Sequence, residues 1–129
     1  MEEKLMLTKI ATKNAPGAIV PYSQAIKYSD VVFTSGQIPL TADGALVEGG
    51  IKAQAEQVMK NLAAVLAEAG ASFDTVIKTT CFLADMADFA AFNEVYGAYI
   101  TSAPARSCVA VKTQPKNVHC EVEVIAVCK

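Results

Sequence analysis

Short runs of alternating apolar and polar residues open and close the chain, and two longer segments between them carry apolar residues at helical spacing. The first runs are typical of β-strands: residues 7–12, 23–28 and 31–35. Ser29-Asp30 suits a tight hairpin turn between the last two of these. From residue 51 to 69, apolar residues recur every three or four positions, which predicts an amphipathic helix. Gly70 is suited to end that helix in a left-handed conformation.

The second half of the chain predicts one more helix and three more strands. The expected strands are residues 75–84, 106–111 and 119–127. Asp85 is placed to cap the helix, and Asp88 adds negative charge near the positive end of its dipole. Four aromatic residues then recur at three- and four-residue intervals and are interpreted as a core-facing stripe: Phe89, Phe92, Tyr96 and Tyr99.

The order of these elements, β-β-β-α-β-α-β-β, predicts an α+β fold in which a mixed sheet carries both helices on one face. Residues 1–129 are expected to form one domain, because the sequence shows no repeat and no linker. Apolar residues make up 53% of the chain and charged residues only 19%. Such a chain has apolar surface to spare, so self-association is expected.

Charge and the N-terminal sequence bear on partners and location. The net charge is −2 and no basic run exists, which weighs against binding nucleic acid. No apolar stretch approaches the roughly 20 residues that span a bilayer. Met1-Glu2-Glu3-Lys4 is charged and is not followed by the apolar core of a secretory signal. We therefore expect a cytoplasmic protein that does not insert into membranes.

The four cysteines, Cys81, Cys108, Cys120 and Cys128, lie in β-like apolar stretches. Neither a CxxC pair nor the Cys/His spacing of a zinc site is present, so reduced, buried thiols are expected. Cys108 is set apart because it neighbours Arg106. Phosphate-binding glycine loops are missing as well, and the sequence predicts no metal and no cofactor.

An arginine and a pair of carboxylates mark the last two predicted strands. Arg106 offers a planar fork that matches a carboxylate with two parallel hydrogen bonds. Alternation in the last strand puts Val122 and its apolar neighbours under the helices, and Glu121 and Glu123 on the other face. Two interpretations are open: a site for a small carboxylate with an acid that holds water, or a structural ion pair between adjacent strands.

Other polar residues are weaker candidates. Ser35 and Gly36 follow a strand and present a hydroxyl beside a close backbone approach. Asn93 interrupts the aromatic stripe and needs a partner, as a satisfied core amide or on a pocket wall. Tyr22 stands at a loop-to-strand boundary, from which its phenol can project into a cleft. His119, the single histidine, is interpreted as a surface residue.

Taken in order, six segments resemble the Rid (YjgF) family of enamine/imine deaminases, also called the L-PSP endoribonuclease family. They are Pro21-Tyr22-Ser23-Gln24-Ala25, Thr34-Ser35-Gly36-Gln37-Ile38-Pro39, Lys78-Thr79-Thr80, Phe92-Asn93-Glu94-Val95-Tyr96, Pro104-Ala105-Arg106-Ser107-Cys108 and Glu121-Val122-Glu123-Val124-Ile125-Ala126-Val127. The resemblance covers nearly the whole chain, from about Ile10 to Val127. It departs from the family pattern at Gln114, Ala110 and Cys120; none of these departures removes a functional position, and Gln114 and Ala110 bear on pocket detail or substrate range.

The resemblance implies a chorismate-mutase-like fold assembled as a homotrimer, with sites in the clefts between subunits. It implies that Arg106 binds the substrate carboxylate and that Glu121 positions or activates the hydrolytic water. The remaining cleft residues are implied to be Tyr22, Ser35, Gly36, Asn93 and Cys108. The substrates are then small 2-imino acids, such as 2-iminopropanoate and 2-iminobutanoate, and the products are 2-oxo acids and ammonia.

Two alternatives to a deaminase stay open. An endoribonuclease is suggested by the family's older name, although RNA cleavage normally uses a basic groove and paired catalytic groups, which this acidic chain lacks. A non-catalytic trimer that binds small ligands, or acts like a chaperone, can use the same carboxylate-binding cleft without turnover.

Overall fold

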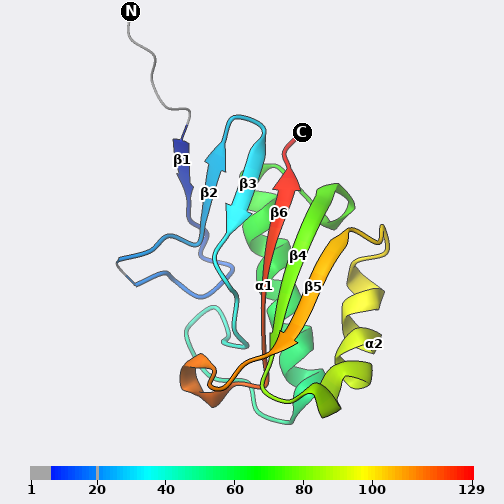
Figure 1. Ribbon diagram of the computed structural model, residues 1–129. Coiled ribbons are helices and arrows are strands. Elements are labelled where there is room, and N and C mark those ends of the chain that lie inside the picture. Colours follow the sequence, from blue (N-terminus) through cyan, green and yellow to red (C-terminus); the bar gives the residue numbers. More distant parts are fainter. Residues whose placement is uncertain (1–6, 20) are drawn as a thin grey trace, which may run out of the picture.

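The computed structural model describes residues 7–19 and 21–129, which form one six-stranded sheet with two helices against one of its faces (Figure 1). The strands are β1 (Leu7–Ile10), β2 (Ala25–Tyr28), β3 (Val31–Thr34), β4 (Val76–Leu83), β5 (Ala105–Ala110) and β6 (Cys120–Val127). The helices are α1 (Ile51–Ala69) and α2 (Phe89–Tyr99). The predicted α+β class, element order and one-sided helix layer are confirmed.

The sheet order is β1-β2-β3-β6-β4-β5, so the last strand of the chain lies in the middle of the sheet. All neighbouring strands are antiparallel except β4 and β5, which are parallel because α2 carries the chain back between them. The expected hairpin joins β2 to β3, where Tyr28 pairs with Val31 and Ser29 takes a left-handed φ of 55°. Strand β4 therefore separates β5 from β6.

Helix α1 buries its apolar stripe against the sheet and ends as the sequence predicts. Gly70 has a φ of 84°, and the turn donates backbone hydrogen bonds back to Ala67 and Leu66. Two buried amides on this helix are satisfied by loops. Asn61 donates to two carbonyls of the segment after β3, and Gln54 accepts from the backbone N–H of His119 at 2.7 Å. His119 is half-buried, between the buried residues Val118 and Cys120, and thus partly exposed.

The starts of β4 and α2 differ slightly from prediction because a short 3₁₀ turn precedes each. Phe73–Thr75 forms the turn before β4, and Met86–Asp88 forms the one before α2. Asp85 caps as expected, with its carboxylate accepting from the Ala87 N–H at 2.9 Å, but the α-helix begins only at Phe89. Such tight turns are common at helix starts and leave no mark on apolar periodicity.

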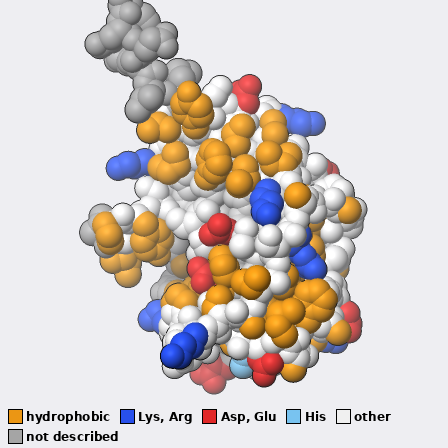
Figure 2. Space-filling model, in the orientation of Figure 1, with side chains coloured by type: hydrophobic (Ala, Val, Ile, Leu, Met, Phe, Trp, Pro, Cys, Tyr) orange, Lys and Arg blue, Asp and Glu red, His pale blue; other side chains and the backbone are white. Residues whose placement is uncertain are grey.

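The face of the sheet away from the helices is apolar over β2 and β3 and mixed over β4 to β6. Register places Ile26 and Ile125 on either side of Phe33, which is 46% exposed while its neighbours in β3 are more buried. Figure 2 shows hydrophobic side chains gathered over β1 to β3 on this side. We call it the open face; its other apolar residues are Tyr28, Val31, Val127, Phe82 and Val109, and its polar residues include Lys78, Thr80, Glu121 and Glu123.

Two further findings bear on the predictions. All four cysteines are free thiols, three of them buried and Cys108 half-buried, as expected. Among the described residues, neither helix combines the length and the apolar character needed to cross a membrane.

Candidate functional site

Arg106 lies near the start of β5, the strand at the edge of the sheet. The parallel register sets it opposite Thr79 and sets Cys108 opposite Cys81. Thr79 and Cys81 are fully buried under the helices. Because paired residues share a face, Arg106 and Cys108 project to the helix side as well.

The Arg106 guanidinium is held by three side chains of α2. Its Nη1 donates a hydrogen bond to Asn93 Oδ1 at 2.8 Å. Its central carbon lies 4.8 Å from the centre of the Tyr96 ring and 5.5 Å from that of Phe89, within the range of cation–π attraction. Asn93 is half-buried, its amide oxygen accepts a hydrogen bond from Arg106, and it lines a cavity. It is therefore both a satisfied amide and part of a pocket wall, the two interpretations that the sequence left open.

No carboxylate of the described residues forms a salt bridge with this arginine. Within residues 7–19 and 21–129 the one side-chain salt bridge is Lys52–Glu94, at 3.0 Å and well exposed. A cavity of about 570 Å³ opens beside the guanidinium, between α2 and the segment that leads into β5. Asn93, Tyr96 and Pro104 line it together with Arg106. A charged fork at the wall of a cavity this large is suited to bind a small carboxylate.

Cys108 is a poor candidate for a nucleophile despite its position beside Arg106. Burial raises the pKa of its thiol, and this outweighs the lowering by Arg106. Burial likewise raises the pKa of Cys81 to about 12. Both groups are neutral thiols at neutral pH, whereas the thiolate is the reactive form.

Glu121 lies on the other side of the sheet. It pairs with Phe82 across β4 and β6 and is half-buried on the open face. Burial raises the pKa of its carboxyl above the ordinary value, and the nearby charge of Glu123 adds to the shift. A carboxyl group with a raised pKa is suited to move a proton near neutral pH.

The predicted close approach at Gly36 is confirmed, and its partner is Glu121. A Cβ added at Gly36 would lie 2.8 Å from Cδ and 3.0 Å from Cγ of that glutamate. The segment is fixed there because the backbone of Gln37 exchanges two hydrogen bonds with Val122, at 2.8 and 3.2 Å. A side chain at position 36 would therefore push the Glu121 carboxylate aside.

Ser35 and Tyr22 flank the same region. The Ser35 hydroxyl donates to the Ser23 carbonyl at 2.6 Å, and its N–H donates to the Gln24 carbonyl at 2.9 Å. These bonds tie the loop before β2 to the end of β3. Tyr22, in that loop, is 55% exposed and lines a cavity of about 550 Å³ with Ser35 and Phe33.

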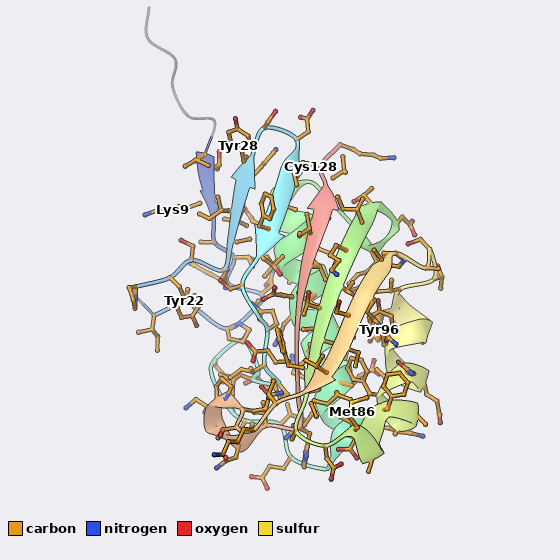
Figure 3. The ribbon with its side chains drawn as sticks, in the orientation of Figure 1. Lys9, Tyr22, Tyr28, Met86, Tyr96 and Cys128 are labelled. Atoms are coloured by element: carbon orange, nitrogen blue, oxygen red, sulfur yellow. The ribbon has the colours of Figure 1, made fainter. Side chains whose placement is uncertain are left out.

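The predicted site residues thus form two groups in one chain. Arg106, Asn93 and Cys108 form the first, between β5 and α2. The second lies at the end of β3 and on β6: Tyr22, Ser35, Gly36 and Glu121. Figure 3 shows the separation, with Tyr22 in the loop on one side of the sheet and Tyr96 of α2 on the other, beside β5.

The alternative of an ion pair between Arg106 and Glu121 is wrong. The two strands are consecutive in the chain but not in the sheet, because β4 lies between them. The two side chains also project to opposite faces.

Three residues that touch or support Arg106 escaped the sequence-based prediction. Phe89 and Tyr96 were interpreted only as core, and Thr79 was not singled out. One signal was available: Phe89, Asn93 and Tyr96 follow one another at intervals of four and three, which lines them up along one helix face. That Arg106 would lie against this face depends on the pairing of β5 with β4, which no local pattern reveals.

One departure from the family pattern has a structural explanation. Gln114 is buried, and its Nε2 donates to the Phe82 carbonyl at 2.8 Å. The buried amide therefore has a hydrogen-bond partner in the backbone of β4.

Comparisons with known proteins agree with this fold and these residues. Residues 12–128 match the family model described as Endoribonuclease L-PSP. Protein MMF1, mitochondrial, from Saccharomyces cerevisiae is 51% identical over 122 residues, covering 94% of this chain and 84% of that protein. The crystal structure of yeast Mmf1 superposes with a TM-score of 0.93 at 50% identity, covering 95% of this chain and 99% of that one.

Two bacterial structures extend the likeness. RidA from the Antarctic bacterium Psychrobacter sp. PAMC 21119 has a TM-score of 0.88 at 41% identity, covering 93% of this chain and 98% of its own. E. coli TdcF, solved with bound serine, has a TM-score of 0.88 at 40% identity, and the match covers 95% of this chain and 99% of the TdcF chain.

The fold is of the α+β class, and Arg106 at the wall of a cavity marks a candidate site for a small anionic molecule. The chain belongs to the Endoribonuclease L-PSP family, the Rid (YjgF) proteins, as its sequence motifs indicate. Membership supports a role as a small-molecule deaminase or a related role.

Proposed function

We propose that this protein hydrolyses reactive 2-imino acids and their enamine tautomers, such as 2-iminopropanoate and 2-iminobutanoate, to 2-oxo acids and ammonia. The observation that carries the proposal is the Arg106 guanidinium, held by α2 at the wall of a cavity and not neutralised by any described carboxylate. The relative TdcF, solved with bound serine, supports it, because serine is likewise a small amino-acid carboxylate.

Arg106 binds and orients the substrate in this scheme. Nη1 of Arg106 donates one N–H to Asn93, and the other N–H groups of the guanidinium can donate to the substrate carboxylate. Holding the carboxylate fixes the adjacent C2, the electrophilic carbon of the imine. Orientation of this kind supplies much of the acceleration in reactions that need no covalent intermediate.

Glu121 handles the protons. It accepts a proton from water as the water oxygen adds to C2 of the protonated imine, which gives a neutral intermediate with hydroxyl and amino groups on the same carbon. It returns that proton to the nitrogen, the C2–N bond breaks to release ammonia, and Glu121 takes the hydroxyl proton as the 2-oxo acid forms. That proton then passes to the departing ammonia. A carboxyl whose pKa is raised by burial serves in both directions. The imine carbon is already electrophilic, so the proposed reaction uses no metal or cofactor.

We further propose that the working site lies between subunits of a homotrimer. Arg106 and Glu121 project from opposite faces of one sheet, so a single chain does not bring both to one small substrate. Arg106, Asn93 and Cys108 of one subunit then face Tyr22, Ser35, Gly36 and Glu121 of the next. The open face supplies apolar surface for such an assembly.

The test is a coupled assay in which an amino-acid oxidase or a pyridoxal-phosphate dehydratase generates the imine in situ. The protein should speed the release of 2-oxo acid beyond the spontaneous rate, and Arg106→Ala should abolish this effect. An imine that decays at its spontaneous rate in the presence of the wild-type protein would refute the proposal.

The same preparation separates the two alternatives. Arg106 binds a carboxylate whether or not water attacks, so 2-oxo acid binding without imine turnover would support a ligand-binding module. RNA cleavage would support an endoribonuclease, although the net charge of −2 and the single histidine argue against that function.

A cytoplasmic location is part of our proposal. The relative MMF1 is named mitochondrial, and cell fractionation tests where this protein lies.

A further inference from the structure

Tyr96 is anchored at one end and contacts Arg106 with its ring. Its hydroxyl lies 2.8 Å from Thr79 Oγ1, in a hydrogen bond between two buried side chains. Thr79 is also the residue directly opposite Arg106 in the β4–β5 register. Strand β4, which pairs with the strand of Arg106, therefore also holds the Tyr96 ring through Thr79.

The anchoring restricts the ring. Tyr96 is 8% exposed and Thr79 is fully buried, so the hydrogen bond between their hydroxyls is shielded from water. Phe92 packs against Tyr96 with ring centres 5.7 Å apart and planes tilted by 36°. A ring with one end hydrogen-bonded and a neighbouring aromatic ring packed against it presents a fixed surface to the guanidinium.

The contact leaves the arginine charged. Burial raises the pKa of the Tyr96 phenol above its ordinary value, so the ring is neutral and attracts the cation through its π-electrons. Asn93 contributes an amide oxygen and Phe89 a second ring. All three partners orient the guanidinium without neutralising it, which leaves its charge for an incoming anion.

We propose that Tyr96, anchored by Thr79, is a positioning residue that presents the Arg106 guanidinium to the substrate carboxylate. This inference rests on the carboxylate-binding role of Arg106 in the proposed function. Thr79 acts on Arg106 indirectly, because its hydroxyl is hydrogen-bonded to the Tyr96 hydroxyl and so holds the ring in place. Neither residue takes part in the chemical step.

The test combines calorimetric binding of pyruvate, the product of 2-iminopropanoate hydrolysis, with KM and kcat for the imine. Tyr96→Leu removes the aromatic face and should raise the Kd of pyruvate and the KM about tenfold, with a smaller change in kcat. Tyr96→Phe keeps the face but loses the hydrogen bond to Thr79, and its Kd should fall between those of the wild type and Tyr96→Leu. Thr79→Val removes the same hydrogen bond from the other side and should resemble Tyr96→Phe.

Two controls separate positioning from general damage to the fold. Tyr99→Leu removes a tyrosine from the same helix, one that packs on Phe73 away from Arg106, and should leave the Kd unchanged. In an Arg106→Lys background the effect of Tyr96→Leu on the Kd should shrink, because the planar group that the ring positions is gone.

Each result decides the inference. A wild-type Kd in Tyr96→Leu, or an equal loss in Tyr99→Leu, would overturn it while the deaminase proposal stands. Wild-type protein that does not bind pyruvate would overturn it too. Protein that binds pyruvate but does not hydrolyse imines would refute the deaminase function alone, and the calorimetric comparison would still judge Tyr96.

Discussion

Arg106 keeps its charge available because the side chains that hold it are an amide and two aromatic rings. A carboxylate in the place of Asn93 would fix the guanidinium equally well but would compete with the ligand. The rings attract the cation without offering it a counter-charge. The neutral character of these three contacts therefore leaves the positive charge of Arg106 for a ligand.

Arg106→Lys should bind 2-oxo acids and hydrolyse imines at least about a hundredfold less well than the wild type. An ammonium is a point charge that reproduces neither the two parallel hydrogen bonds nor the contact between flat surfaces. Calorimetry with pyruvate and the coupled assay measure the two losses, and Arg106→Ala sets the floor. Near wild-type activity in the lysine variant would mean that the fork is not what captures the carboxylate.

Glu121→Gln should retain pyruvate binding and lose most turnover, because an amide keeps the shape of the side chain but cannot accept a proton. Glu123→Gln is the matched control on the same face of β6 and should be milder. Loss of both binding and turnover in Glu121→Gln would make the residue structural. A stronger effect at Glu123 would mean that the role belongs two residues further along the strand.

The raised pKa of Glu121 also predicts pH effects of defined sign. The base form is needed, so activity should rise with pH through a pKa above the ordinary glutamate value, and this step should vanish in Glu121→Gln. A pKa raised by folding means that the folded protein binds the proton more tightly than the unfolded chain. Glu121 therefore reduces stability as pH rises through that window, and Glu121→Gln should melt higher than the wild type at neutral pH.

The elements determine which residues meet. The parallel pairing of β5 with β4 sets Arg106 opposite Thr79 and beside α2. On the other side of β4, the bridge between Gln37 and Val122 holds the segment after β3 against β6, so that Gly36 crosses over Glu121. Each group forms where a strand is paired with a segment distant in sequence.

Gly36→Ala should test the second of these arrangements. The new methyl group would collide with the Glu121 side chain, so the carboxylate must move or the segment must lift from β6. We expect a loss of about 1–3 kcal/mol in unfolding free energy, typical of an overpacked site, and a large loss of turnover. Gly17→Ala, where an added Cβ meets nothing within 4 Å, is the control, measured by denaturant unfolding and the coupled assay.

For the whole molecule, the decisive feature is that the two residue groups lie on opposite faces of one sheet. A site that needs both must draw them from different subunits, and the apolar open face offers a surface for assembly. In the proposed shared site, function and oligomeric state are inseparable, because a monomer would hold only half of each site.

Mixing two inactive variants tests this directly. Arg106→Ala lacks the carboxylate-binding group and Glu121→Gln lacks the base, but a mixed trimer holds some clefts with both residues intact. Random reassembly of equal amounts should restore about one quarter of wild-type activity, since each cleft draws independently on two subunits. Absence of any recovery, or a stable monomer in sedimentation, would contradict the shared site.

The sequence alone determined the elements and most of the candidate residues. Periodicity located α1 and its end at Gly70, because a helix that covers a sheet must bury one stripe and its last carbonyls need a left-handed residue. Alternation placed Glu121 away from the helices, because side chains in a strand point to opposite faces in turn. These features depend only on neighbours along the chain.

Only the tertiary structure decided which of those residues meet. The position of β4 between β5 and β6 separates Arg106 from Glu121 and rules out the ion pair that their nearness in sequence suggested. It also revealed Tyr96 and Thr79 as the support of the arginine. Strand order and helix packing arise from burial of apolar surface across the whole chain, a sum of distant contacts that no local pattern records.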